Sequence, residues 1–116
     1  MQVSNDVDKY LNYYIESIWF LGKLQISAIK NMVEYKGQGA EYISCSFDPD
    51  DEDYKEGYVT LYFWEPAVEQ DTMVFVDNKK FYDYLMSTCK EFIEKEPQIK
   101  DELEGYLHQI KMELNI

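Results

Sequence analysis

The fold of this chain is decided by residues 41–76, which read EYISCSFDPDDEDYKEGYVTLYFWEPAVEQDTMVFV. Apolar and polar residues alternate over 42–47, over 58–64 and, in a shorter stretch, over 72–76. A period of two residues predicts half-buried strands. Each of the two connections contains a proline and is short enough to join antiparallel neighbours. We therefore expect a three-stranded antiparallel meander.

On the N-terminal side of the meander, apolar residues recur every three or four positions from about residue 6 to residue 35. This spacing predicts one long amphipathic helix. Gly22 lies in its middle and marks a point where the helix is expected to kink or break. Lys36 and Gly37 supply a basic last turn and a glycine stop.

On the C-terminal side, two shorter helices are expected. Asp77 or Asn78 is placed to cap the first, and Pro97 ends it and suits the first turn of the next. The last helix spans about residues 98–114. The order α-β-β-β-α-α predicts one α+β domain over residues 1–116, with the helices on one face of a small sheet.

Composition excludes several classes of protein. The chain has 116 residues, 23 acidic residues against 11 basic ones, and a formal net charge of −12. All the basic residues are lysines. This balance argues against binding nucleic acid or an anionic membrane surface, both of which require clustered cations. A hydrophobic fraction of 46% argues against a disordered acidic tail. A folded domain with a basic partner is favoured.

The negative charge is concentrated in the predicted meander. Residues 41–71 contain ten acids and a single lysine, Lys55, so this quarter of the chain carries a net charge of −9. The densest part is 48–57, and a second acidic stretch follows at 65–71. The charge therefore predicts a localised acidic surface on the loops around the sheet.

Residues for catalysis or metal binding are scarce. His108 is the single histidine, and neither Cys45 nor Cys89 fits a redox or zinc motif. The two cysteines are expected to be buried thiols in a cytoplasmic protein. We expect no enzyme activity, no cofactor and no metal. The acidic loop fails the EF-hand template, because Asp53 and Val59 stand where it requires glycine and glutamate. A weak site for a divalent ion, or a merely solvated loop, is the alternative.

The aromatic residues suggest a contact surface. Tyr42, Tyr58, Tyr62 and Trp64 fall on the sheet face opposite the apolar row, and such side chains anchor protein interfaces. They form a partly exposed patch if the helices cover the other face. They are buried if the long first helix packs over them instead.

From about Glu41 onward, the chain resembles the immunity proteins of bacterial contact-dependent growth inhibition systems that are paired with ribonuclease toxins. The resemblance covers roughly the last two thirds of the chain. It rests on three segments: ISCSFDPDD (43–51), VTLYF (59–63), and FYDYL (81–85) followed by Cys89, Phe92 and Ile93.

The resemblance implies a cytoplasmic protein that binds a toxin domain delivered by a neighbouring cell and blocks its active site. A ribonuclease cleft is basic, so its inhibitor needs carboxylates in the place of phosphates. By charge and patterning we expect a one-to-one complex contacted through Asp48, Asp50, Asp51, Glu52, Asp53, Glu56, Tyr58, Tyr62, Trp64, Glu65, Glu69 and Asp71. The alternative is an acidic nucleic-acid mimic that inhibits another nucleic-acid enzyme.

Overall fold

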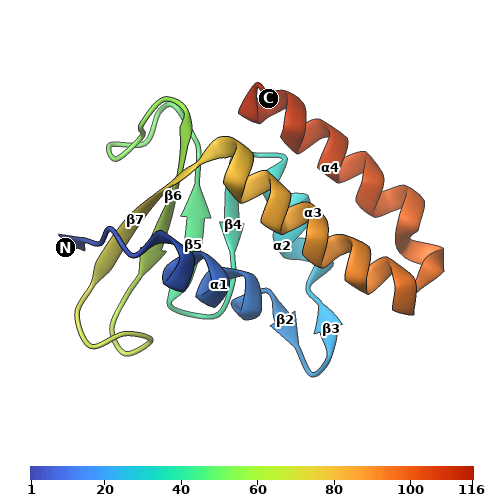
Figure 1. Ribbon diagram of the computed structural model, residues 1–116, viewed down its shortest axis with the longest axis horizontal. Helices are drawn as coiled ribbons and strands as arrows, with labels where there is room; N and C mark the ends of the chain where they lie inside the picture. Colours follow the sequence, from blue (N-terminus) through green and yellow to red (C-terminus); the bar gives the residue numbers. More distant parts are fainter.

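A computed structural model describes all residues, 1–116, and its centre is a five-stranded sheet (Figure 1). The strands lie in the order β1-β7-β6-β5-β4. The central three are antiparallel neighbours, which confirms the predicted meander. Each edge gains a short strand, parallel at β1 and antiparallel at β4. The bounds are β1 Gln2–Val3, β4 Lys36–Gln38, β5 Ile43–Ser46, β6 Tyr58–Phe63 and β7 Thr72–Asp77.

One face of the sheet forms the core, as the alternation predicts. The register places Gly37, Cys45, Leu61 and Val74 in one row across four strands, and all four residues are buried. Neighbouring rows on this face also bury their apolar side chains. Together with residues from every helix they form one core cluster of 24 buried residues, so the sheet and helices share a single core.

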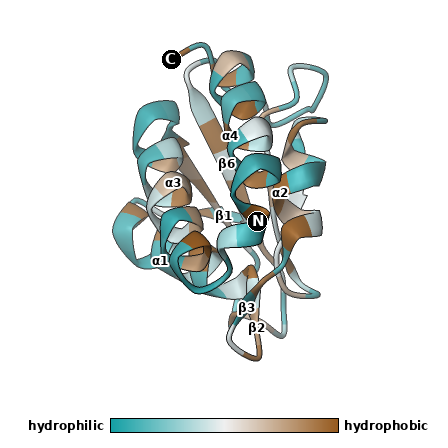
Figure 2. Cartoon of the chain, turned by 90° about the vertical axis from the view of Figure 1, so that its right-hand side faces the viewer, coloured by the Kyte–Doolittle hydropathy of each residue, from teal (hydrophilic) through white to brown (hydrophobic).

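Four α-helices lie on this inner side of the sheet (Figure 1). Their bounds are α1 Val7–Ser17, α2 Ile26–Met32, α3 Asn78–Lys95 and α4 Lys100–Leu114. Helices α1 and α3 contact the central strands, α2 contacts the edge strand β4, and α4 packs on α2 and α3. The outward faces of α3 and α4 are largely hydrophilic (Figure 2). None of the helices combines the length and the apolar character needed to cross a membrane.

The predicted N-terminal helix of residues 6–35 is wrong, because the segment forms two helices separated by a hairpin. Strands β2, Trp19–Phe20, and β3, Lys23–Leu24, pair through a turn in which Leu21 and Gly22 have φ of 52° and 79°. Two consecutive left-handed residues are the requirement of a tight hairpin turn. The break at Gly22 was therefore expected, but not the hairpin that it forms.

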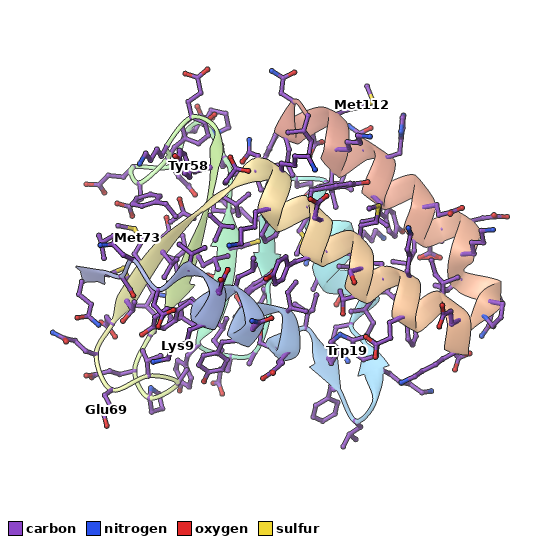
Figure 3. The ribbon with its side chains drawn as sticks, viewed as in Figure 1. Lys9, Trp19, Tyr58, Glu69, Met73 and Met112 are labelled. Atoms are coloured by element: carbon purple, nitrogen blue, oxygen red, sulfur yellow. The ribbon has the colours of Figure 1, made fainter.

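Trp19 holds this hairpin against α3, as Figure 3 shows. Its indole N–H donates to the Thr88 hydroxyl at 2.8 Å, and its ring meets Phe92 edge-on at a centroid distance of 5.7 Å. Continuing α1 as a helix would turn Trp19 away from these partners. The packing of an aromatic side chain on a distant helix thus overrides the local helical spacing.

Gly37 is not the helix stop that the sequence predicts. Helix α2 ends at Met32, Tyr35 adopts a left-handed conformation with φ of 74°, and Gly37 is the middle residue of β4. A Cβ atom at Gly37 would lie 2.7 Å from the Tyr14 hydroxyl and 2.8 Å from the Met32 methyl carbon. Glycine is needed here because the edge strand passes directly over buried side chains.

The C-terminal predictions are confirmed. The Asp77 side chain caps α3 by accepting hydrogen bonds from the backbone N–H groups of Lys79 and Lys80, at 3.0 and 3.2 Å. Pro97 opens a 3-10 turn, Pro97–Ile99, that leads directly into α4. The prolyl ring suits this first turn, since it brings no N–H that would need a partner.

Candidate functional site

The outer face of the sheet is the surface that no helix covers. Polar side chains occupy it on the edge side, where Gln38, Ser44 and Tyr62 form one row across β4, β5 and β6. Lys36, Ser46 and Thr60 form the next row. Alternation within each strand sends these side chains outward while their neighbours fill the core.

The acidic connection between β5 and β6 folds back over this face. The carboxylate of Asp51 accepts a hydrogen bond from the Ser46 hydroxyl. Asp53 contacts the sheet through its backbone oxygen, 3.4 Å from the Thr60 hydroxyl, and through its carboxylate, 3.4 Å from the Tyr62 hydroxyl. The loop therefore buries Thr60, which is 2% exposed, and is held against the sheet.

Lys36 places a cation among these acids. Its ammonium lies 3.2 Å from a carboxylate oxygen of Asp51 and 3.9 Å from one of Asp48. The hydrogen bond from Ser46, followed by that from Lys36, holds the pKa of Asp51 below its usual range. Asp48 also accepts from the backbone N–H of Asp50 at 2.9 Å. Two of the acids thus hold the loop in place.

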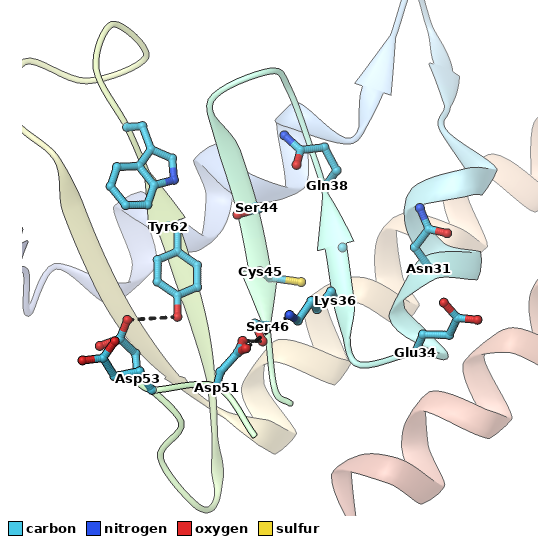
Figure 4. A pocket seen from close by; sticks show the side chains of 13 residues that line it. Asn31, Glu34, Lys36, Gln38, Ser44, Cys45, Ser46, Asp51, Asp53 and Tyr62 are labelled. Carbon is cyan, nitrogen blue, oxygen red and sulfur yellow. Dashed lines mark hydrogen bonds and ion pairs between the residues drawn. The ribbon is translucent and has the colours of Figure 1, made fainter. Parts of the chain in front are cut away.

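A groove of about 620 Å³ runs between the loop and the edge strand (Figure 4). Its floor is formed by β4 and β5, and one wall by residues 51–53 together with Tyr62 and Trp64. It extends past the edge of β4 to Asn31 and Glu34, at the end of α2. Four carboxylates line it against the single ammonium of Lys36, so the groove is strongly acidic.

The aromatic wall of this groove is flat and accessible. The rings of Tyr62 and Trp64 stack at a centroid distance of 6.3 Å and an interplanar angle of 4°. Trp64 is 43% exposed, and Tyr42, which does not line the groove, is 39% exposed. Burial and the neighbouring Asp53 raise the pKa of Tyr62 to about 12, so its hydroxyl stays protonated and neutral at physiological pH. The interpretation in which the first helix buries these aromatics is wrong.

Comparison with known proteins gives one match. A family model described as CDI immunity protein, where CDI is contact-dependent growth inhibition, matches residues 6–107, from the start of α1 into α4. The chain belongs to this family. The resemblance to contact-dependent growth inhibition immunity proteins, inferred from about Glu41 onward, is thereby confirmed and extends over the N-terminal helices as well, whereas the ribonuclease target stays a prediction. Searches of curated proteins and of solved structures found no match.

The immunity protein brings five of the twelve predicted contact residues into one groove. These are Asp51, Glu52, Asp53, Tyr62 and Trp64. Asp50 and Glu56 are exposed on the same loop, outside the groove. Tyr58 lies under Lys55, whose ammonium is 4.4 Å from the centre of its ring, so this aromatic is partly covered by the chain's own cation.

The second acidic stretch lies elsewhere. Residues 65–71 join β6 to β7, at the end of β6 opposite the loop of residues 48–57 (Figure 1). There the Asp71 carboxylate accepts from the backbone N–H of Glu65 at 2.8 Å, and Glu69 faces the N-terminal part of α1. Glu65, Glu69 and Asp71 therefore belong to a different part of the surface from the groove.

Several groove residues escaped the sequence analysis. Lys36 was assigned to a helix end, although Lys36 and Gln38 both belong to β4 and face outward. Ser44 and Ser46 carry a usable signal, because they occupy the polar positions of the strand that precedes the acidic loop. Glu34 has no such signal, since only the turn after α2 brings it to the groove.

The remaining reactive groups do not come together. No three histidine, cysteine, aspartate or glutamate side chains are arranged to hold a metal ion. Both cysteines are free and buried, and burial raises the pKa of each thiol to about 12. His108 is exposed on α4, beside α3, and does not line the groove.

Proposed function

We propose that this immunity protein neutralises a ribonuclease toxin domain delivered by a neighbouring cell. It acts in the cytoplasm, as a one-to-one complex, by laying the acidic side of its sheet over the basic active-site cleft of the toxin. It catalyses no reaction and uses no cofactor. The observation that carries the proposal is the acidic groove on the one sheet face that the helices leave open.

The charges of this surface suit such a target. A cleft that binds RNA must present cations to the phosphates. Glu34, Glu52 and Asp53 line the groove and form no ion pair within the chain, so their charge is available to a partner. Complementary charge of this kind accelerates association and excludes neutral partners.

The experiment first isolates the partner by pull-down with this protein and then uses its toxin domain. RNA cleavage by that domain is measured with increasing immunity protein, and the association rate is measured at about 50 and about 500 mM salt. We expect full inhibition at one equivalent and an association rate that falls by about tenfold or more at high salt. Inhibition without any salt dependence would contradict the electrostatic mechanism, and a toxin that cleaves only DNA would contradict the ribonuclease assignment.

Two pairs of variants that remove the same number of charges test whether the groove is the surface that binds the toxin. Glu52→Gln with Asp53→Asn removes two charges from the groove, and Glu91→Gln with Glu94→Gln removes two exposed charges from α3. Both pairs remove two negative charges from the protein. Only the first pair is expected to slow association, by about tenfold. Equal effects of the two pairs would mean that overall charge, rather than this face, governs binding.

A further inference from the structure

We propose that the groove binds one arginine side chain of the partner, with its guanidinium stacked on Trp64 and hydrogen-bonded to the carboxylates of Glu52 and Asp53. This inference rests on the proposed function, because it names the chemistry by which the same surface holds the toxin. It follows from which groups of the groove are already used within the chain and which are free.

The one cation that lines the groove and three of its neutral donors are engaged within the chain, while Asn31, Ser44 and Trp64 keep neutral donors free. The Lys36 ammonium is paired with Asp51 and Asp48. The side-chain amide nitrogen of Gln38 donates to the backbone oxygens of Ala40 and Glu41, at 2.6 and 3.1 Å, and of Ile43 at 3.2 Å. The Tyr62 hydroxyl donates to Asp53. No free positive charge is left for an anion, because the remaining donors are neutral.

The acceptors, in contrast, are free. Because the amide nitrogen of Gln38 is turned to the backbone, its carbonyl oxygen remains without a partner at the groove (Figure 4). Glu52 and Glu34 form neither an ion pair nor a side-chain hydrogen bond, and Asp53 accepts one 3.4 Å bond. A groove with free carboxylates and no free cation favours a ligand that carries several N–H groups and positive charge.

The aromatic wall distinguishes arginine from lysine. The rings of Tyr62 and Trp64 are nearly parallel, and Trp64 is 43% exposed and lines the same groove as the acids. A planar guanidinium stacks on an indole ring and still directs its N–H groups sideways to carboxylates. A lysine ammonium is a compact, strongly hydrated charge and gains less from the flat ring. The shape and the charge of the site together favour arginine.

The test uses a hexa-arginine peptide as the probe and the tryptophan indole N–H signals of the ¹⁵N-labelled protein as the readout. The chain has two tryptophans, and Trp19 donates to Thr88 away from the groove, so it is an internal control. We expect the Trp64 signal to shift on addition of hexa-arginine while the Trp19 signal stays in place. A hexa-citrulline peptide, which has the same shape without the charge, should shift neither.

The affinities of two cationic peptides distinguish arginine from lysine at the site. Hexa-lysine is expected to bind about tenfold more weakly than hexa-arginine, and Trp64→Leu should weaken hexa-arginine by about tenfold. The α3 pair Glu91→Gln with Glu94→Gln is the control of equal charge. If hexa-lysine binds as well as hexa-arginine, or if the Trp64 signal does not move, the arginine site is wrong.

Inhibition of the toxin by variants distinguishes a failure of the arginine site from a failure of the proposed function. Trp64→Leu is expected to weaken inhibition of the toxin by about tenfold, whereas Tyr42→Leu, another exposed aromatic outside the groove, should change it little. If Glu52→Gln with Asp53→Asn weakens inhibition but Trp64→Leu does not, the acidic surface stands and the arginine site fails. If neither affects inhibition, the proposed surface fails as well.

Discussion

Replacing Gly37 with alanine tests the tightest packing in the protein. The edge strand β4 crosses the core at this residue, and an added Cβ atom would meet the Tyr14 hydroxyl at 2.7 Å and two carbon atoms of Met32 at 2.8 and 2.9 Å. Tyr14 and Met32 are both 0% exposed. These neighbours have no solvent to move into, so the strand or the core must shift.

The change in the free energy of unfolding on Gly37→Ala is the sum of two opposing effects. Inserting a methyl group into a filled core costs about 1–3 kcal/mol. Alanine also loses less backbone entropy than glycine on folding, which returns about 0.5–1 kcal/mol in a strand. We therefore expect Gly37→Ala to lower the free energy of unfolding by about 1–2 kcal/mol, which corresponds to about 4 °C in melting temperature per kcal/mol in a domain of this size.

Urea unfolding followed by circular dichroism measures this change, and two further variants make it specific. Gly105→Ala in α4 has no atom within 4 Å of its new Cβ, so it should raise stability by about 1 kcal/mol. The Tyr14 hydroxyl is buried and has at most the Cys45 thiol, a weak partner, so Tyr14→Phe should cost little. Because it removes one of the three contacts, it should also restore about 0.5–1 kcal/mol in the Gly37→Ala background.

Either of two results would refute this reasoning. One is a Gly37→Ala variant as stable as the original protein, which would mean that the strand moves aside freely. The other is a double variant whose loss equals the sum of the two single losses, because the steric contact with Tyr14 would then contribute nothing.

Three more predictions concern separate parts of the structure. Leu21 has φ of 52° and is 86% exposed, so Leu21→Asn should raise the free energy of unfolding by about 0.5–1 kcal/mol in urea titrations, since asparagine tolerates this conformation; a lower stability would show that Leu21 makes a favourable contact. The pKa of Asp51 is lowered in the folded state, so its stabilising contribution is complete above the unfolded value of about 3.9 and is lost as pH falls through the folded value. Ser46→Ala should therefore reduce the loss of stability between about pH 5 and pH 2, and an unchanged pH profile would exclude this hydrogen bond as the cause. Cys45 and Cys89, with pKa values of about 12, should not react with Ellman's reagent at pH 8 until urea unfolds the chain; rapid labelling of the folded protein would contradict their burial.

The meander and the two C-terminal helices were predictable because their signals are local. Alternation of period two needs only the strand itself, and the Asp77 cap and Pro97 act within one turn of the chain. The N-terminal third was mispredicted where distant contacts decide. Trp19 leaves the helical path to bond Thr88, and Gly37 leaves the helix end to cross the core beside Tyr14.

The candidate site also has features that the sequence predicts and features that depend on distant contacts. The amino-acid sequence alone determined that the surface is acidic and aromatic. The ten carboxylates of residues 41–71 must lie in loops or on an outward face, and the alternation of the strands places the tyrosines on that face as well. The sequence could not tell which carboxylates are free. Asp48 and Asp51 are held by Lys36, which lies on a strand that pairs with β5 only in the folded sheet.

Only the tertiary structure separated the two acidic stretches and built the groove. They are neighbours in sequence, but the six residues of β6 hold them at opposite ends of a rigid strand. The groove exists because the turn after α2, the edge strand β4 and the loop after β5 converge on one sheet face. Charge is a property of composition and is visible in any chain, whereas a concave arrangement of free acceptors beside a flat aromatic ring requires segments far apart in sequence to meet.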